Sequence, residues 1–342
     1  RGGDTEGVPR LVEGFVRAQA TATPEQAAEL VREYRLPREA LQPEHLRSPE
    51  VWEALLEDMP MTALVRNLAT MTRVGVLTPG SDGTVRVVEQ LGDGERIRRA
   101  RLHPITILAA LRTYASGRGV RGRHTWVAVG EIVDALDAAF YTAFGNVEPV
   151  GKRLLLALDV SGSMTMDEVA GIPGLTPRDA SAALALVTVA TEPNVEVVGF
   201  YAGRGGYRKA GPGRFHHGGD GLTPLPLSPR QRLDDAVRTV SDLPFGGTDC
   251  ALPMLYAQSL QREIDTFVIY TDSETWAGDV HPAQALRAYR HASGIEARLV
   301  VVGMVSNGFS IADPADPEML DVVGFDTATP QLISDFARGA LS

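Results

Sequence analysis

The feature that most constrains the fold of this chain is a change of pattern near residue 150. Beyond this point, apolar runs of strand length alternate with amphipathic stretches of helical length. The apolar runs are 153–158, 195–201, 266–270 and 297–302, and the helical stretches are 178–191, 230–240, 251–261, 282–292 and 330–340. Such alternation predicts a parallel, doubly wound sheet with ligands at the carboxyl ends of its strands. The Gly- and Pro-rich stretch 203–227 is predicted to be an edge hairpin and loop, because proline is poorly tolerated in a central strand.

The part of the chain before this change shows only helical patterns. Thr23-Pro24, Ser48-Pro49 and His103-Pro104 each place a proline where the first turn of a helix tolerates it. A helix is also predicted from about Thr84 towards Arg99, and a last one from Glu131 to Phe144. No strand pattern precedes residue 153. These observations predict stacked antiparallel helix pairs, an architecture of the α-solenoid type.

Composition limits the classes of protein and partner. A single cysteine, Cys250, rules out an intramolecular disulfide and fits a reducing cytoplasm. No apolar run approaches the ~20 residues of a membrane span, and no signal peptide is visible, so a cytoplasmic protein without membrane contact is expected. The net charge of −10 argues against a wholly basic nucleic-acid binder. The charge is uneven, however, because residues 96–123 hold eight arginines and no Asp or Glu.

A candidate metal site begins where the first predicted strand ends. Asp159, Ser161 and Ser163 fall at alternating positions after the apolar run, so their side chains are expected to point to one side. Carboxylate and hydroxyl oxygens are hard ligands that suit Mg²⁺ or Mn²⁺ rather than zinc. Asp and Ser at such junctions also serve in turns and helix caps, which is the alternative interpretation.

Two later segments are expected at the same edge of the sheet. Thr248 follows a tight Gly246-Gly247 loop before a helix, and Asp272 follows the strand 266–270. Because the carboxyl ends of parallel strands meet at one edge, these side chains should approach the first segment. The predicted ligands share oxygen donors and include two carboxylates: Asp159, Ser161, Ser163, Thr248 and Asp272.

These residues, in this order, resemble the metal-ion-dependent adhesion site of von Willebrand factor A domains. The resemblance implies that the two serines and Thr248 lie close to the metal, and that Asp159 and Asp272 bind it directly or through water. It implies Mg²⁺ as the cofactor, with Mn²⁺ or Ca²⁺ as alternatives. It also implies an open coordination position for an acidic group of a protein partner.

The chain as a whole resembles the Ro autoantigen family, the RNA-binding proteins of Ro ribonucleoproteins. The segments that carry this resemblance are 52–76, 102–123, 138–160, 246–254, 270–290 and 303–313. The family joins a ring of HEAT-like helical pairs, the TROVE module, to a Rossmann-like von Willebrand A domain. Residues 1–149 are therefore interpreted as the C-terminal part of a TROVE module and 150–342 as the A domain. Since the helical part is too short to close a ring, the chain is expected to be the C-terminal part of a longer protein or a truncated relative.

The arginine-rich region is the candidate RNA surface. Guanidinium groups pair with phosphates bidentately and stack on bases, whereas the alternative is a solvated helix face and a loop. The candidate RNA-binding residues lie within residues 96–123: Arg96, Arg98, Arg99, Arg101, His103, Arg118, Arg121 and Arg123. His103 precedes a proline, so its alternative role is that of a helix cap.

Three hypotheses for function follow from these sites. The first is a non-enzymatic Ro-type protein that binds small non-coding (Y-like) RNA and misfolded RNA in RNA quality control, in concert with an exoribonuclease. The second is a metal-dependent protein-interaction module without RNA binding. The third is metal-dependent phosphoryl hydrolysis with Asp159 as nucleophile. This hypothesis is disfavoured because serines occupy the positions where a second carboxylate or a base would be expected. His216-His217 are interpreted as exposed loop residues rather than metal ligands, and Glu274 and Asp279 are expected to shape the rim of the site and add negative potential. Cys250 is expected to pack beneath the Thr248 loop.

Overall fold

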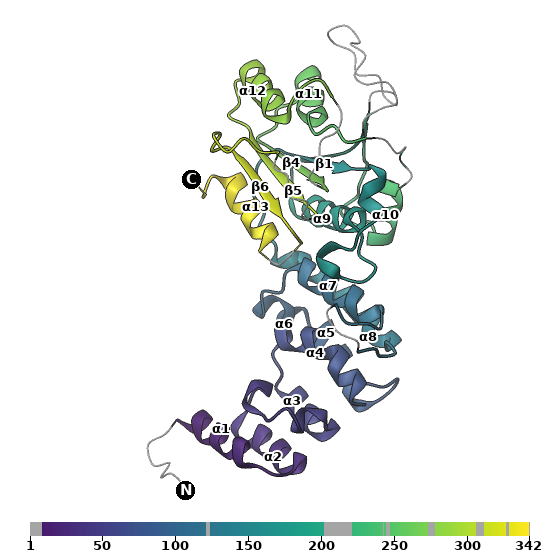
Figure 1. The fold of residues 1–342 in the computed structure, drawn as a ribbon, viewed down its shortest axis with the longest axis vertical. Coiled ribbons are helices and arrows are strands. Elements are labelled where there is room, and N and C mark those ends of the chain that lie inside the picture. Colours follow the sequence, from purple (N-terminus) through teal and green to yellow (C-terminus); the bar gives the residue numbers. More distant parts are fainter. Residues whose placement is uncertain are drawn as a thin grey trace. The chain divides into compact units, whose positions relative to one another are not determined.

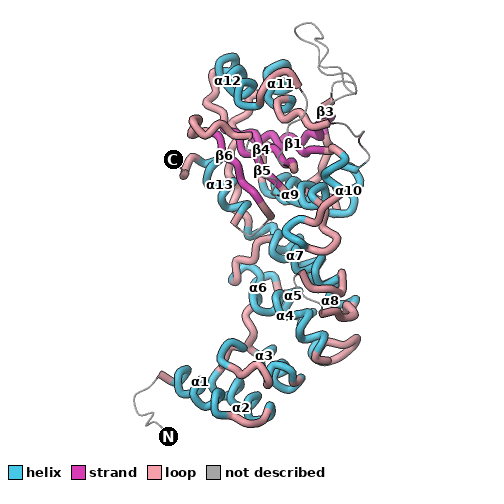
Figure 2. The backbone as a smooth tube through the Cα atoms, in the orientation of Figure 1, coloured by secondary structure: helices cyan, strands magenta, loops and turns pink. Residues whose placement is uncertain are grey.

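The structure is a computed structural model that describes residues 9–120, 124–201, 221–241, 243, 247–272, 278–305, 311–325 and 328–341. It divides into two compact units, residues 1–146 and 147–342. The first unit is helical, and the second contains the sheet (Figures 1 and 2). The predicted fold class, a helical segment followed by a doubly wound α/β domain, is confirmed.

The helical unit is a series of short amphipathic helices. They are α1 (Arg10–Ala20), α2 (Pro24–Tyr34), α3 (Pro49–Glu57), α4 (Met61–Arg73), α5 (Asp82–Gly92), α6 (Gly94–Arg99), α7 (Pro104–Ala115) and α8 (Gly130–Thr142). Helix α2 packs on α3, and α5 and α7 both pack on α8. The apolar side chains between them are buried, including Trp52, Leu64 and Phe140. No helix in the described ranges is both long and apolar enough to cross a membrane.

The prediction of a single helix from Thr84 towards Arg99 is wrong, because the helix is interrupted at Asp93. The Asp93 side chain accepts hydrogen bonds from the backbone N–H groups of Glu95 (2.9 Å) and Arg96 (3.2 Å), which makes it the N-cap of α6. Gly92 and Gly94 flank this residue and disfavour a continuous helix. Two helices therefore replace one.

The second unit is built on a six-stranded sheet with the order β3-β2-β1-β4-β5-β6. The strands are β1 (Leu154–Asp159), β2 (Val195–Phe200), β3 (Leu222–Pro224), β4 (Thr266–Thr271), β5 (Arg298–Gly303) and β6 (Met319–Val323). All neighbouring pairs are parallel except β2–β3. Strand β3 is an antiparallel edge strand ending at a proline, within the predicted edge segment. The rest of that prediction falls on residues 202–220, outside the described residues.

Helices cover both faces of the sheet (Figure 1). Helices α9 (Pro177–Thr191), α10 (Leu233–Ser241) and α13 (Thr329–Arg338) lie on one face, and α11 (Leu252–Ser259) and α12 (Pro282–Ser293) on the other. The core under α11 and α12 includes Ala157, Phe267 and Leu299 from three adjacent strands. Their alternation along each strand leaves the intervening side chains to face α9.

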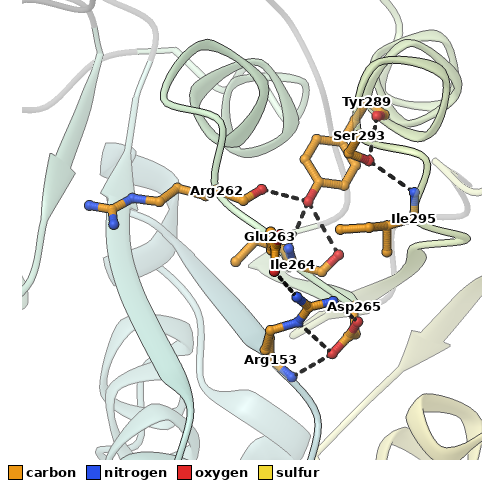
Figure 3. A network of polar contacts seen from close by, with 8 residues as sticks. All are labelled: Arg153, Arg262, Glu263, Ile264, Asp265, Tyr289, Ser293 and Ile295. Atoms are coloured by element: carbon orange, nitrogen blue, oxygen red, sulfur yellow. Dashed lines mark hydrogen bonds and ion pairs between the residues drawn. The ribbon is translucent and has the colours of Figure 1, made fainter.

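A polar network fixes the amino ends of β1 and β4 (Figure 3). Arg153 donates from Nε and Nη2 to the two carboxylate oxygens of Asp265, at 3.0 and 2.6 Å, and its backbone N–H donates to the same carboxylate at 2.9 Å. The Tyr289 hydroxyl accepts from the Ile264 backbone N–H and donates to the Arg262 carbonyl oxygen, both at 2.7 Å. Because both strands start in fixed positions, their carboxyl ends are aligned as well.

Candidate functional site

Strand register brings Asp159 to a cluster of hydroxyl groups. Leu158 pairs with Tyr270 across β1 and β4, so the next residues, Asp159 and Thr271, also lie beside each other. The Thr271 hydroxyl donates to Asp159 Oδ2 at 2.8 Å, and the Thr248 hydroxyl donates to the same oxygen at 3.1 Å. All three side chains belong to buried residues. The end of β1 therefore presents a buried carboxylate that two hydroxyl groups already contact.

The two serines of the predicted site lie in the turn that follows Asp159. The Ser161 backbone N–H donates to Asp159 Oδ1 at 2.8 Å, and the Ser161 and Ser163 hydroxyl oxygens are 3.0 Å apart. A 3₁₀ turn over Gly162–Thr165 produces this arrangement by bending the chain directly after the strand. Ser161 is buried and Ser163 is exposed, so this side of the cluster reaches the solvent.

Asp272 is the second carboxylate, one residue beyond the end of β4. It is half-buried. Burial of Asp159 raises the pKa of that carboxyl to about 6, and the negative charge of Asp272 acts in the same direction. The ionised form of Asp159 is thus disfavoured where it stands, and a bound cation would stabilise it.

The donor set fits a hard divalent cation. Hydrogen bonds connect Asp159 to Ser161 and Thr248, and Ser161 to Ser163, while Asp272 acts on Asp159 through its charge. Among the described residues no three His, Cys, Asp or Glu side chains converge. The residues that would hold a cation here are Asp159, Asp272, Ser161, Ser163 and Thr248, which offer two carboxylates and three hydroxyl oxygens. Such oxygen ligands suit Mg²⁺ or Mn²⁺ and disfavour zinc.

Sequence reasoning missed two residues that contact this cluster. Thr271 follows from the period of two along β4 once the register with β1 is known, but register is not visible in a single sequence. Arg178, in the first turn of α9, is buried and donates from Nη2 to the carbonyl oxygens of Val160 and Ser161, both at 3.0 Å. No local pattern marks this arginine as different from an exposed one.

Other candidates near the cluster have structural roles or lie outside the described residues. Asp249 is buried and accepts a hydrogen bond from the Ala251 backbone N–H at 3.0 Å, and burial raises the pKa of its carboxyl to about 6. Cys250 is fully buried in the sheet core, close to its expected position beneath the Thr248 loop. Asp279 is exposed. Glu274 and the pair His216-His217 lie outside the described residues.

The predicted RNA-binding arginines near α6 differ in their surroundings. Arg98 forms an ion pair with Glu95, which lies one residue outside the acid-free stretch. Arg96 is half-buried and donates to the Met59 carbonyl oxygen at 3.4 Å. Arg99 and Arg101 are exposed. Arg101 also has a φ of +49°, in the left-handed region that favours glycine, where it ends α6.

His103 serves as the N-cap of α7. Its Nδ1 accepts a hydrogen bond from the Ile105 backbone N–H at 3.2 Å. Burial lowers the pKa of His103 to about 4, so the ring is neutral at pH 7. A neutral ring can stack on a base or donate a hydrogen bond, but it neutralises no phosphate.

Arg118 lies shortly after the end of α7, in a segment that pairs with the residues leading to α8. It forms an antiparallel bridge with Thr125, and the Trp126 backbone N–H donates to the Gly117 carbonyl oxygen at 3.0 Å. The Trp126 ring stacks on Tyr114, with centroids 6.3 Å apart. These contacts anchor the base of the predicted basic loop. Arg121 and Arg123 lie outside the described residues.

Comparison with known proteins finds a matching family for each of the two units. The sequence profile of the Ro60 von Willebrand A domain matches residues 153–337, and that of the TROVE domain matches residues 36–113. The chain belongs to the Ro60 family. It is 47% identical over 331 residues to a Deinococcus radiodurans protein named RNA-binding protein RO60, which covers 96% of this chain and 59% of that protein. It is 41% identical over 333 residues to the Caenorhabditis elegans protein of the same name, covering 97% of this chain and 48% of that protein.

A solved structure supports the Ro60 family fold. The crystal structure of the D. radiodurans RO (RSR) protein matches with a TM-score of 0.86 at 46% identity, covering 96% of this chain and 63% of that one. This chain thus spans about half to three-fifths of the length of these Ro60 relatives.

Proposed function

We propose that this chain binds RNA through its helical unit and a divalent cation through its α/β unit. The RNA is of the Ro type, small non-coding (Y-like) RNA and structured or misfolded RNA, and the role is RNA quality control in the cytoplasm. The α/β unit acts as a Mg²⁺-dependent protein-interaction domain. The protein works by binding rather than by catalysis, with an exoribonuclease as the functional partner.

One observation carries the RNA part of this proposal. Two relatives named as RNA-binding proteins align with nearly the whole chain, including the segment that holds the arginines. Arg98 and Arg99 at the end of α6 and Arg101 two residues further on are all exposed. Exposed guanidinium groups at this spacing suit phosphates of a structured or single-stranded RNA.

The metal part rests on the chemistry of the cluster around Asp159. Burial disfavours the charged form of the Asp159 carboxylate, and the hydrogen bonds from the Ser161 N–H and the Thr271 hydroxyl offset only part of this effect, so a bound cation would stabilise the carboxylate. Bound Mg²⁺ would supply a Lewis-acidic position for an external carboxylate. The exposed Ser163 and half-buried Asp272 leave the approach to that position open. The corresponding partner is a protein that offers an acidic side chain.

RNA titration with a matched pair of variants tests the RNA part. The triple variant Arg98→Ala, Arg99→Ala, Arg101→Ala removes three charges from the proposed surface. The control triple Arg230→Ala, Arg238→Ala, Arg262→Ala removes three exposed arginines from the α/β unit. Binding of a fluorescent structured RNA is measured by anisotropy from 50 to 200 mM salt, at constant free Mg²⁺.

The salt dependence decides between the hypotheses. Each lost phosphate contact lowers the slope of log K against log salt by ~0.7, so three contacts correspond to about 2. Over a fourfold change in salt, the wild type should therefore lose about 15- to 20-fold more affinity than the first variant. The control variant should match the wild type. If the two triple variants behave alike, the α6 arginines are not the RNA surface. If the wild type binds no RNA at 50 mM salt, the RNA part of the proposal is wrong and the result favours the hypothesis of a protein-interaction module.

A further inference from the structure

Arg178 is buried at a position where both the surroundings and the helix dipole disfavour a positive charge. It is the second residue of α9, behind Thr176, whose side chain caps the helix, and only 3% of its surface is exposed. The positive end of the helix dipole lies at this first turn and repels a cation. Burial opposes the charge as well and lowers the pKa of Arg178. Both effects act against placing a guanidinium here.

Hydrogen bonds and nearby negative charges offset these penalties, and the hydrogen bonds reach the residues that follow β1. Arg178 Nη2 donates to the carbonyl oxygens of Val160 and Ser161, each at 3.0 Å. The negative charges of Asp159 and Asp179 favour its charged form. The two carbonyl groups belong to the residues between Asp159 and the 3₁₀ turn that carries Ser163. Arg178 therefore holds the backbone of the Asp159–Ser163 loop from the protein interior.

We propose that Arg178 is a positioning residue of the cation site, which fixes the Asp159–Ser163 loop in a ligand-binding conformation before a cation arrives. Its hold on two successive carbonyl groups sets the direction of the peptide planes. The Val160 carbonyl and the Ser161 N–H belong to one planar peptide unit and point in opposite directions, so with the carbonyl directed at Arg178 the N–H remains directed at Asp159 Oδ1. The two serine hydroxyl oxygens then lie 3.0 Å apart. This inference rests on the proposed cation site for its consequence, but the loop conformation itself can be measured without a cation.

The expected effect on affinity follows from the behaviour of residues that orient metal ligands. Loss of such a residue typically weakens metal binding by about 10- to 100-fold. Arg178→Met preserves most of the side-chain volume and removes the hydrogen bonds. Arg178→Lys retains a positive charge and a donor but lacks the planar guanidinium group. Leu186→Ala is the matched control, because Leu186 is fully buried about two turns further along the same helix.

The test combines Mn²⁺ binding with hydrogen exchange of the full chain. Mn²⁺ titration by calorimetry should show at least about tenfold weaker binding by Arg178→Met, an intermediate affinity for Arg178→Lys, and wild-type affinity for Leu186→Ala. Exchange measured by mass spectrometry without metal should accelerate over 159–165 in Arg178→Met, relative to 154–158 in the same variant. In Leu186→Ala both peptides should change together, because a core cavity lowers global stability.

The outcomes separate this proposal from the proposal of the cation site. If Arg178→Met binds Mn²⁺ as tightly as the wild type and its 159–165 peptide stays protected, Arg178 is only a core residue and the inference is wrong. If the wild type binds no Mn²⁺, the cation site is wrong, and the exchange of 159–165 still decides whether Arg178 holds the loop. If the wild type binds no Mn²⁺ and the exchange of 159–165 is the same in Arg178→Met as in the wild type, the inference about Arg178 is wrong as well.

Discussion

The cap at the start of α7 makes the stability of the helical unit depend on one histidine. His103 accepts the Ile105 backbone N–H through Nδ1, a hydrogen bond that only the ring with an unprotonated Nδ1 can accept. Its pKa falls from an ordinary 6.5 to about 4 because the ring is buried. The unfolded chain therefore binds more protons than the folded chain between pH 4 and 6.5. The stabilisation is complete above pH 6.5 and is lost as the pH falls towards 4.

The magnitude follows from these two pKa values. Lowering the pH from 7 to 5 should cost the helical unit about 2 kcal/mol by linkage, or about 1 to 2 kcal/mol once the partial exposure of the ring is discounted. The variant His103→Asn keeps an N-cap acceptor and has no titrating group. Between pH 7 and 5, this variant should therefore lose about 1 to 2 kcal/mol less stability than the wild type.

Urea unfolding provides the assay. A Trp276→Phe background leaves Trp52 and Trp126 as fluorescence reporters, both within the helical unit. Protonation of other groups affects both proteins equally and cancels in the difference between them. Equal loss of stability in the wild type and His103→Asn between pH 7 and 5 would refute the reasoning, because His103 would then remain neutral in the unfolded chain or charged in the folded one.

Three further predictions concern single positions. Arg101→Ala and Arg101→Gly should weaken RNA binding equally, but the glycine variant should be about 1 kcal/mol more stable in urea, because only glycine adopts a φ of +49° without strain; equal stability would contradict this. Gly278→Ala should cost at least about 2 kcal/mol in urea unfolding followed by far-UV circular dichroism, since its φ is +95° and an added Cβ would meet Asp249 Oδ2. Gly130→Ala, with nothing within 4 Å of its added Cβ, is the control. His103→Asn should leave the salt slope of RNA binding unchanged, because the ring is neutral at pH 7, and a shallower slope would assign it a charge.

The sequence predicts well what depends on short-range patterns. Prolines at 24, 49 and 104 each occupy the first position of a helix, because the missing N–H costs nothing there. Alternating apolar runs locate β1, β2, β4 and β5, which are buried on both faces. The convergence of Asp159 with the end of β4 follows from the rule that the carboxyl ends of parallel strands meet at one edge.

Features that depend on long-range pairing or on single side chains were missed. Strand β6 has an acidic residue at its centre, and the pattern shows no apolar run. The carboxylate of this residue, Asp321, accepts the Ala312 backbone N–H at 3.1 Å, so its charge has a local role that hydropathy does not reveal. The Arg98–Glu95 pair crosses the boundary of the acid-free stretch, and reduces the charge available to RNA there. Arg178 acts on a loop 17 residues away in sequence.

The central claim is that RNA and a divalent cation bind at different units of this chain, and a crossed binding experiment tests it most directly. Mn²⁺ affinity and RNA affinity are measured for Asp272→Asn and for the triple variant at Arg98, Arg99 and Arg101. Asp272→Asn should weaken Mn²⁺ binding by at least about tenfold and leave RNA affinity unchanged, since it removes one of two ligand charges. The triple arginine variant should show the opposite pattern. A loss of RNA affinity in Asp272→Asn, at constant free Mg²⁺, would contradict the account.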